Sequence, residues 1–208
     1  MMYELVRHIN AVAVTHFHDA ALCPVSARYE KQAGFEAVWR RIEEDHRCNA
    51  LLWIEEDKAR RIDVADAYIA ASKRRIDRYN EQRSDAVQAI DEGLLETLGH
   101  RPRHNGARLH SETPGTIIDR LSVLSLKIHH MRGYAGRPAA GNAVMDGGRS
   151  RLASLVEQRV DLARCFDELI AGAALGLVYY KVYRPRTAAY NDRPLGPYPF
   201  MARNDLVA

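Results

Sequence analysis

Polar residues interrupt two helical ladders of this chain at positions where apolar residues would normally face a core. On the first ladder, stepping by four and three, aromatic residues give way to His46 and Asn49. On the second, Asn80 and Arg83 stand in the middle of a stripe whose ends are apolar. Burying a neutral amide without a partner costs roughly 2–7 kcal/mol, and burying a charge costs more. The ladders therefore predict a polar pocket inside a helical bundle, whose side chains satisfy one another or bind a ligand.

Three cations on these two helices can converge, because the short connection between the helices favours antiparallel pairing. A buried cationic cluster needs an anion. Neighbouring carboxylates supply it, or the sulfate, phosphate or carboxylate of a substrate does, and the sequence leaves both sources open. The cations are Arg60, Lys73 and Arg83, and the neighbouring carboxylates are Glu56, Asp57 and Asp77.

A general base is available in Glu56, Asp119 or His46. Glu56 is favoured because Trp53 and Arg60 flank it, and a buried indole would lower the local dielectric and strengthen charge contacts. The alternative is an ordinary surface ion pair, since Glu56 and Arg60 are four residues apart in the favourable acid-first order.

A further helix carries polar residues within an otherwise apolar segment. Asp119 and Arg120 follow its start, and Lys127 lies seven residues after Arg120 on the same side. We predict Glu56 and Asp119 as the catalytic carboxylates. The predicted substrate-binding set is His46, Asn49, Trp53, Arg60, Lys73, Asn80, Arg83, Arg120 and Lys127.

Neither a metal nor a cofactor is expected. Glu43 and His46 have the i, i+3 spacing of helical di-iron sites, but such sites need a second copy of that pair, and the chain has none. Glycine-rich nucleotide loops and a nucleophile beside an obvious base are also missing from the sequence.

Length and charge favour one domain of a protein that stays inside the cell. The chain has 208 residues, a net charge of +3 with acids and bases interspersed, and three widely spaced cysteines. Nothing in this pattern indicates nucleic acid, a membrane surface or export. We therefore expect a cytoplasmic protein whose partners are a small anionic substrate and a second subunit, either a different small protein or another copy.

The periodicity predicts an all-α bundle of about five helices, three of them long. Expected helices cover residues 2–21, 27–61, 63 or 66 to 99, and 149–183. The fourth in chain order starts with Thr113 as cap and Pro114 in the first turn, and runs to Met131. Five glycines predict a loop over 133–148. Residues 1–184 form the expected bundle domain, and 185–208 an extended tail rich in Pro and Tyr.

Three motifs carry a family resemblance. They are NALLWIEEDKAR at 49–60, KRRIDRYNEQRSD at 73–85 and SETPGTIIDRLS at 111–122. On these motifs the chain resembles the bacterial domain of unknown function 4254 family. The resemblance implies an all-helical fold and an association with glycoconjugate or natural-product biosynthesis. The chain departs from the family pattern at Ile54, where histidine is usual, and at 181–185, which indicates a specialised branch.

Within such a branch, the chain is similar to small two-component enzymes that close the aziridine ring of azinomycin-type metabolites by expelling sulfate. That resemblance implies a carboxylate base, cations for the leaving sulfate, no cofactor and a second protein subunit. The competing hypothesis is a non-catalytic helical partner, in which the polar ladders set the register of packing.

Overall fold

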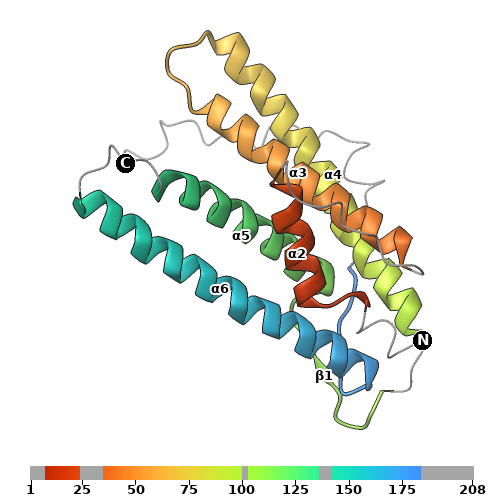
Figure 1. The fold of residues 1–208 in the computed structure, drawn as a ribbon. Coiled ribbons are helices and arrows are strands. Elements are labelled where there is room, and N and C mark those ends of the chain that lie inside the picture. The colour runs from red at the N-terminus through yellow and green to blue at the C-terminus, as the bar shows by residue number, and fades with distance from the viewer. Residues whose placement is uncertain (1–7, 24–34, 100–102, 136–141, 184–208) are drawn as a thin grey trace, which may run out of the picture.

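The chain folds into two helical hairpins with a short helix between them. The computed structural model describes residues 8–23, 35–99, 103–135 and 142–183. Helices α3 (Glu36–Ala59) and α4 (Asp66–Leu98) form one antiparallel pair, and α5 (Pro114–Ala135) and α6 (Asn142–Ala174) form the other. The short α2 (Ala11–Ala21) lies across the space between the pairs (Figure 1). An all-α bundle with five helices in the described ranges is therefore confirmed.

Strand structure in the described residues is limited to one parallel ladder, in which β1 (Arg108–Leu109) pairs with β2 (Val178–Tyr179). The ladder ties the segment before α5 to the segment after α6. Gly176 lies in the turn between α6 and β2 and has a φ of 73°, a value that favours glycine. None of the helices in the described ranges combines the length and the apolarity that a membrane span requires.

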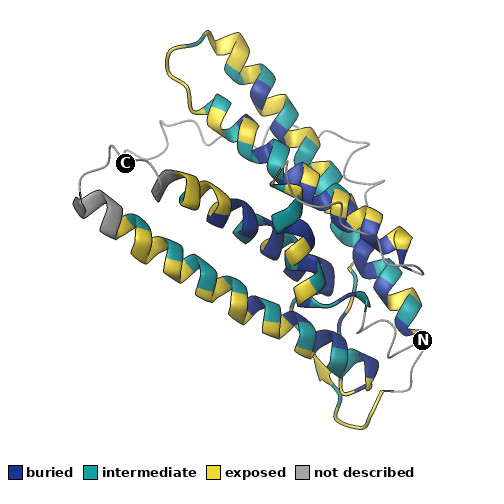
Figure 2. Cartoon of the chain, viewed as in Figure 1, coloured by how far each residue is buried: buried dark blue, intermediate teal, exposed yellow. Residues whose placement is uncertain are grey.

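The apolar core is formed by residues of α2, α3, α4, α5 and α6. Trp39, Phe166 and Leu121 are almost fully buried there. Figure 2 shows buried positions gathered along the first half of α5 and largely missing from the far tip of the α3–α4 hairpin. That tip extends beyond the other helices, so residues on one face of α3 are buried near its start and exposed near its end.

Two predicted helices are not continuous, and their predicted starts at 2 and 27 lie outside the described residues. The expected helix over 2–21 is interrupted, because α2 starts only after Asn10, whose side-chain Oδ1 accepts a hydrogen bond from Ala13 N at 2.9 Å. Ala11 N donates instead to Asp167 on α6 at 2.8 Å, a tertiary contact that no local pattern reveals. Phe35 is likewise non-helical, so α3 is not continuous with the predicted start at Ala27.

The predicted glycine-rich loop is also wrong over most of its length. Helix α5 continues through Gly133 to Ala135, and α6 already contains Gly147 and Gly148. Only 136–141 of the predicted loop lies outside the described residues. At the other end, α6 stops at Ala174 rather than Tyr183, since the chain turns back there to form β2. The predicted tail, 185–208, lies outside the described residues.

The starts of α4 and α5 agree more closely with prediction. Helix α4 starts at Asp66 and ends at Gly99, whose φ is 69°, although Ala65 rather than an aspartate occupies the cap position. Thr113 caps α5 as predicted, because its Oγ1 accepts a hydrogen bond from Thr116 N at 3.3 Å. Gly115 brings the first turn of α5 against α4, where its N–H donates to Asp91 Oδ1 at 2.6 Å.

Candidate functional site: a buried carboxyl pair

Two carboxyl groups meet inside the bundle, Asp45 from α3 and Asp119 from α5. Asp45 is completely buried, and neither of its oxygens has a donor among the described residues. Burial, then the charge of Asp119 and a hydrogen bond to it, raise the pKa of Asp45 well above its ordinary value. Two carboxylates cannot hydrogen-bond unless one carries a proton. Burial and the neighbouring Asp119 therefore both favour the protonated form of Asp45.

The neighbours of Asp119 are a hydrogen-bond donor and a cation. Asn49 donates its side-chain N–H to Asp119 Oδ1 at 2.8 Å, and the guanidinium of Arg83 lies 3.9 Å from the same oxygen. Asp119 and Arg83 are both partly exposed, with 20% and 31% of their side chains accessible. The pair thus combines a buried carboxyl group with one that solvent or a ligand can reach.

A hydrogen-bonded chain continues from this pair into the core. Asn49 gives its second amide hydrogen to Ser122 Oγ at 3.1 Å, and Ser122 Oγ lies 2.8 Å from His46 Nδ1. The Ser122 oxygen accepts from Asn49 and has both a hydrogen and a second lone pair left for His46 Nδ1, so the direction of this last hydrogen bond depends on the tautomer of the imidazole. Burial lowers the pKa of His46 to about 4, so the ring is neutral at pH 7.

The side chains of Asp119, Asn49, Ser122 and His46 form a polar seam, and a second buried histidine extends it. His18 on α2 is fully buried and stacks on His46, with ring centroids 4.6 Å apart. Its two ring nitrogens have no hydrogen-bond partner in the part of the chain that the structure describes. Burial, followed by the neighbouring His46 and Arg159, lowers the pKa of His18 well below its ordinary value. Arg159 closes this end of the seam with an ion pair to Asp19 at 2.6 Å.

On its other side, the carboxyl pair opens into a cleft of about 510 Å³ between α4, α5 and the segment after β2. Arg83 and Asp119 line it together with Thr113, Thr116 and Lys181. The start of α5 thus borders the same space and adds the positive end of a helix dipole. Asp91 also lines the cleft, and burial raises its pKa to about 6 even though Thr113 and Gly115 donate to it. The cleft can hold a small polar molecule between cationic and carboxyl side chains.

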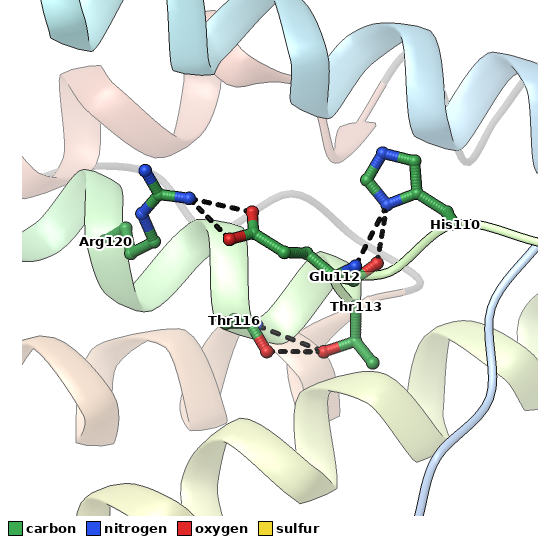
Figure 3. A network of polar contacts seen from close by, with 5 residues as sticks. All are labelled: His110, Glu112, Thr113, Thr116 and Arg120. Carbon is green, nitrogen blue, oxygen red and sulfur yellow. Dashed lines mark hydrogen bonds and ion pairs between the residues drawn. The ribbon is translucent and has the colours of Figure 1, made fainter.

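The predicted cation Arg120 lies outside this cleft. Its guanidinium makes two contacts to the Glu112 carboxylate, at 2.6 and 2.8 Å. Figure 3 shows Glu112 reaching back to Arg120, while Thr113 and Thr116 meet on the opposite side of the helix start. Arg120 and Lys127 line a separate groove between α5 and α6. Their role in substrate binding remains a prediction.

The predicted buried cluster of three cations does not form. Arg60 is 70% exposed and contacts Glu56 at 3.7 Å and Asp57 at 3.1 Å, and Lys73 pairs with Asp77 at 2.8 Å. These residues lie on the hairpin tip that no other described helix covers, which leaves Arg83 near the carboxyl pair without them. Glu56 forms an exposed ion pair with Arg60, which is the alternative that their spacing in the sequence predicts.

Two other predicted binding residues, Asn80 and Trp53, lie outside the carboxyl pair, and so does Glu43 of the rejected metal pair. Asn80 is half-buried on α4, one turn before Arg83. Trp53 is half-buried and stacks on His130 of α5, with ring centroids 4.4 Å apart and the planes 2° from parallel. Glu43 is exposed while His46 is buried, so the two do not point toward one place.

Asp45 and Ser122 belong to the site but were not predicted from the sequence. A different ladder on α3 would have found the aspartate: Val38, Ile42, Asp45, Asn49 and Leu52 are all buried, with the carboxyl in the middle of the stripe. Ser122 belongs to an apolar helix in which serine is common, so its residue type carries little signal. Only its distances to His46 and Asn49 reveal its place in the seam.

The fold and the site define a small all-α protein with two neighbouring carboxyl groups at the edge of its core. A family model described as "Protein of unknown function (DUF4254)" matches residues 39–182. The chain belongs to that family. The match takes in α3, α4, α5, α6 and β2, and with them Asp45, Asp119 and Arg83. No curated protein matches the chain. No solved structure matches it either.

Proposed function

We propose that this protein is a small biosynthetic enzyme, or one subunit of such an enzyme, that binds an anionic small molecule in the cleft beside Asp119. The observation that carries the proposal is the pairing of the buried Asp45 with an accessible Asp119 and Arg83. A buried carboxyl group whose pKa is raised by a second carboxylate is typical of acid–base sites.

Each group has a distinct role in this proposal. Asp119 accepts a proton from the substrate, and Arg83 binds its anionic group or stabilises a leaving anion. Asp45 lies against Asp119, and two neighbouring carboxyl groups bind and release their protons as a coupled pair. Asn49 orients Asp119 by hydrogen bonding, which makes it a positioning residue. The carboxyl pair supplies acid–base chemistry from the chain's own residues.

The specific reaction we propose is the attack of an amine on a neighbouring carbon with loss of sulfate. The nitrogen lone pair forms the C–N bond, the C–O bond breaks, and sulfate leaves with the electron pair. Asp119 takes the proton that the nitrogen loses, and Arg83 binds the departing sulfate. The product is an aziridine. This version rests on the family resemblance of the sequence together with the cation–carboxylate pair at the cleft.

Sulfate release tests this reaction. The natural chain, co-purified with its genomic neighbours, is incubated with 2-aminoethyl hydrogen sulfate as the minimal amino sulfate ester, and free sulfate is measured by ion chromatography. We expect release to fall by about a hundredfold or more in Asp119→Asn and Arg83→Ala. Glu56→Gln tests the other predicted base in the same assay. Undiminished release in both Asp119→Asn and Arg83→Ala would refute the proposed site.

The second candidate function is that of a non-catalytic helical partner in a biosynthetic complex. The exposed hairpin tip favours it, since Arg60 and Lys73 there are neutralised by their own neighbours and Ile62 is fully exposed. Deleting the residues after Pro185 separates the two functions. A docking protein loses its complex on deletion and keeps it in Asp119→Asn, whereas an enzyme loses turnover in Asp119→Asn.

A further inference from the structure

A second pocket lies away from the carboxyl pair and is lined by residues of α3, α5 and α6. Its volume is about 330 Å³. Trp53, Met131 and Leu155 provide apolar surface from three different helices, and His130 stacks on Trp53. A half-buried indole held flat against a second ring forms a rigid apolar surface.

Two cations border this apolar surface. Lys127 from α5 and Arg151 from α6 line the pocket, and neither forms an ion pair with a carboxylate of the described residues. The other cations on nearby surfaces are mostly paired, as Arg120 is with Glu112 and Arg164 is with Asp161. Burial and the neighbouring His129 lower the pKa of His130, and the negative charge of Asp57 opposes that shift.

From this combination we infer that the pocket binds an organic anion with a flat apolar body, such as an aryl sulfate, phosphate or carboxylate. The body packs on Trp53, Met131 and Leu155, and the anionic group lies between Lys127 and Arg151. An inorganic anion would leave the apolar surface uncovered, and a neutral aromatic molecule would leave both cations without a partner.

The pocket is separate from the carboxyl pair, so this inference does not rest on the proposed function. Lys127 lies eight residues beyond Asp119 on α5, which corresponds to about 12 Å along the helix axis. The buried Leu52 and Leu126 lie on α3 and α5 between the two places. Ligand binding at Trp53 and proton transfer at Asp119 can therefore be lost independently.

Binding of 2-naphthalenesulfonate tests the inference, with isothermal titration calorimetry and Trp fluorescence as readouts. We expect binding to the natural chain, and quenching that disappears in Trp53→Phe because the other tryptophan, Trp39, is buried. Lys127→Ala and Arg151→Ala each weaken binding about fivefold, and added salt weakens it further. Both side chains are exposed, so these variants leave the fold intact.

Matched controls make the result specific. Arg164→Ala removes an exposed cation from another part of α6 and should leave binding unchanged. 2-Naphthol and inorganic sulfate each supply half of the recognised chemistry and should bind at least about tenfold more weakly than the sulfonate. Asp45→Asn should bind the sulfonate as the natural chain does.

Three results would overturn the inference. The first is no detectable binding of the sulfonate at millimolar concentration. The second is equal affinity in the natural chain and in a Lys127→Ala, Arg151→Ala double variant. The third is loss of binding in Asp45→Asn with retention in the double variant, which would move the ligand to the carboxyl pair.

Discussion

The side-chain nitrogen of Asn49 lies 2.8 Å from Asp119 Oδ1 and 3.1 Å from Ser122 Oγ, so one amide group uses both of its hydrogens inside the bundle. Asn49 is therefore the donor in both of these hydrogen bonds. Reversing the amide would place its oxygen against the Asp119 carboxylate. The two acceptors thus define the orientation of the Asn49 amide.

Replacing Asn49 with aspartate tests this arrangement. The variant puts a third carboxyl group beside Asp45 and Asp119 and removes both donated hydrogens. We expect the free energy of unfolding to fall by about 3–5 kcal/mol at pH 7, as measured by urea denaturation. The same change at the exposed Asn105 should have almost no effect. Equal stability of the two variants would mean that Asn49 does not hold Asp119.

Replacing Asp45 with asparagine tests where the proton resides. The pKa of Asp45 is raised on folding, so the natural chain has the full stability contribution of this group below pH 4 and loses it as pH rises toward the folded pKa. Asparagine is neutral at every pH. The variant should therefore gain stability relative to the natural chain as pH increases from 4 to 8, followed by urea denaturation.

An exposed carboxyl group provides the control for Asp45. Asp161→Asn on α6 should change the free energy of unfolding to the same small extent at pH 4 and at pH 8, because this side chain is exposed. A constant difference between Asp45→Asn and the natural chain across the pH range would show that Asp45 is ionised in the folded protein.

The buried His46 should make the protein sensitive to mild acid. Its pKa falls from 6.5 to about 4 on folding, so its contribution to stability is complete above pH 6.5 and is lost as pH falls toward 4. The loss amounts to roughly 3 kcal/mol. Asparagine preserves an acceptor for Ser122 without titrating, so His46→Asn should reduce this acid sensitivity, whereas His104→Asn, at an exposed position, should not.

Gly115 permits the contact that positions the start of α5. A Cβ placed there would lie 2.5 Å from the carbonyl oxygen of Val87, closer than real atoms approach. Gly115→Ala should lower the free energy of unfolding by about 2 kcal/mol or more. Gly133→Ala, in the same helix with open space around it, should raise it by about 0.5–1 kcal/mol. Thermal denaturation of the two variants compares them directly.

Much of the fold is encoded locally. The ends of α4 and the start of α5 agree with prediction because Gly99, Thr113 and Pro114 act on the backbone of their own helix. The missed break before α2 has a different origin. Asn10 caps that helix, but the N–H of Ala11 is satisfied by Asp167, a residue 156 positions away.

The candidate site was likewise predictable only in part from local sequence. Helical periodicity placed His46 and Asn49 on one polar face, and Asp119 was predicted as a polar interruption of an apolar helix. Hydrogen bonds join all three in the structure. Periodicity specifies the face of a helix on which a residue lies, but it does not specify which part of that face another helix covers. Arg60 and Lys73 share faces with seam residues but lie on the part of the hairpin that extends beyond α5 and α6, so solvent surrounds them.

By itself, then, the sequence determined the helical class, the family, several helix ends and the presence of polar residues in the core. The tertiary structure decided which of those residues meet. Asp45 has a raised pKa because the crossing of α3 and α5 brings Asp119 against it and excludes water. Both conditions depend on two segments more than 70 residues apart, and no pattern within either segment expresses the distance between them.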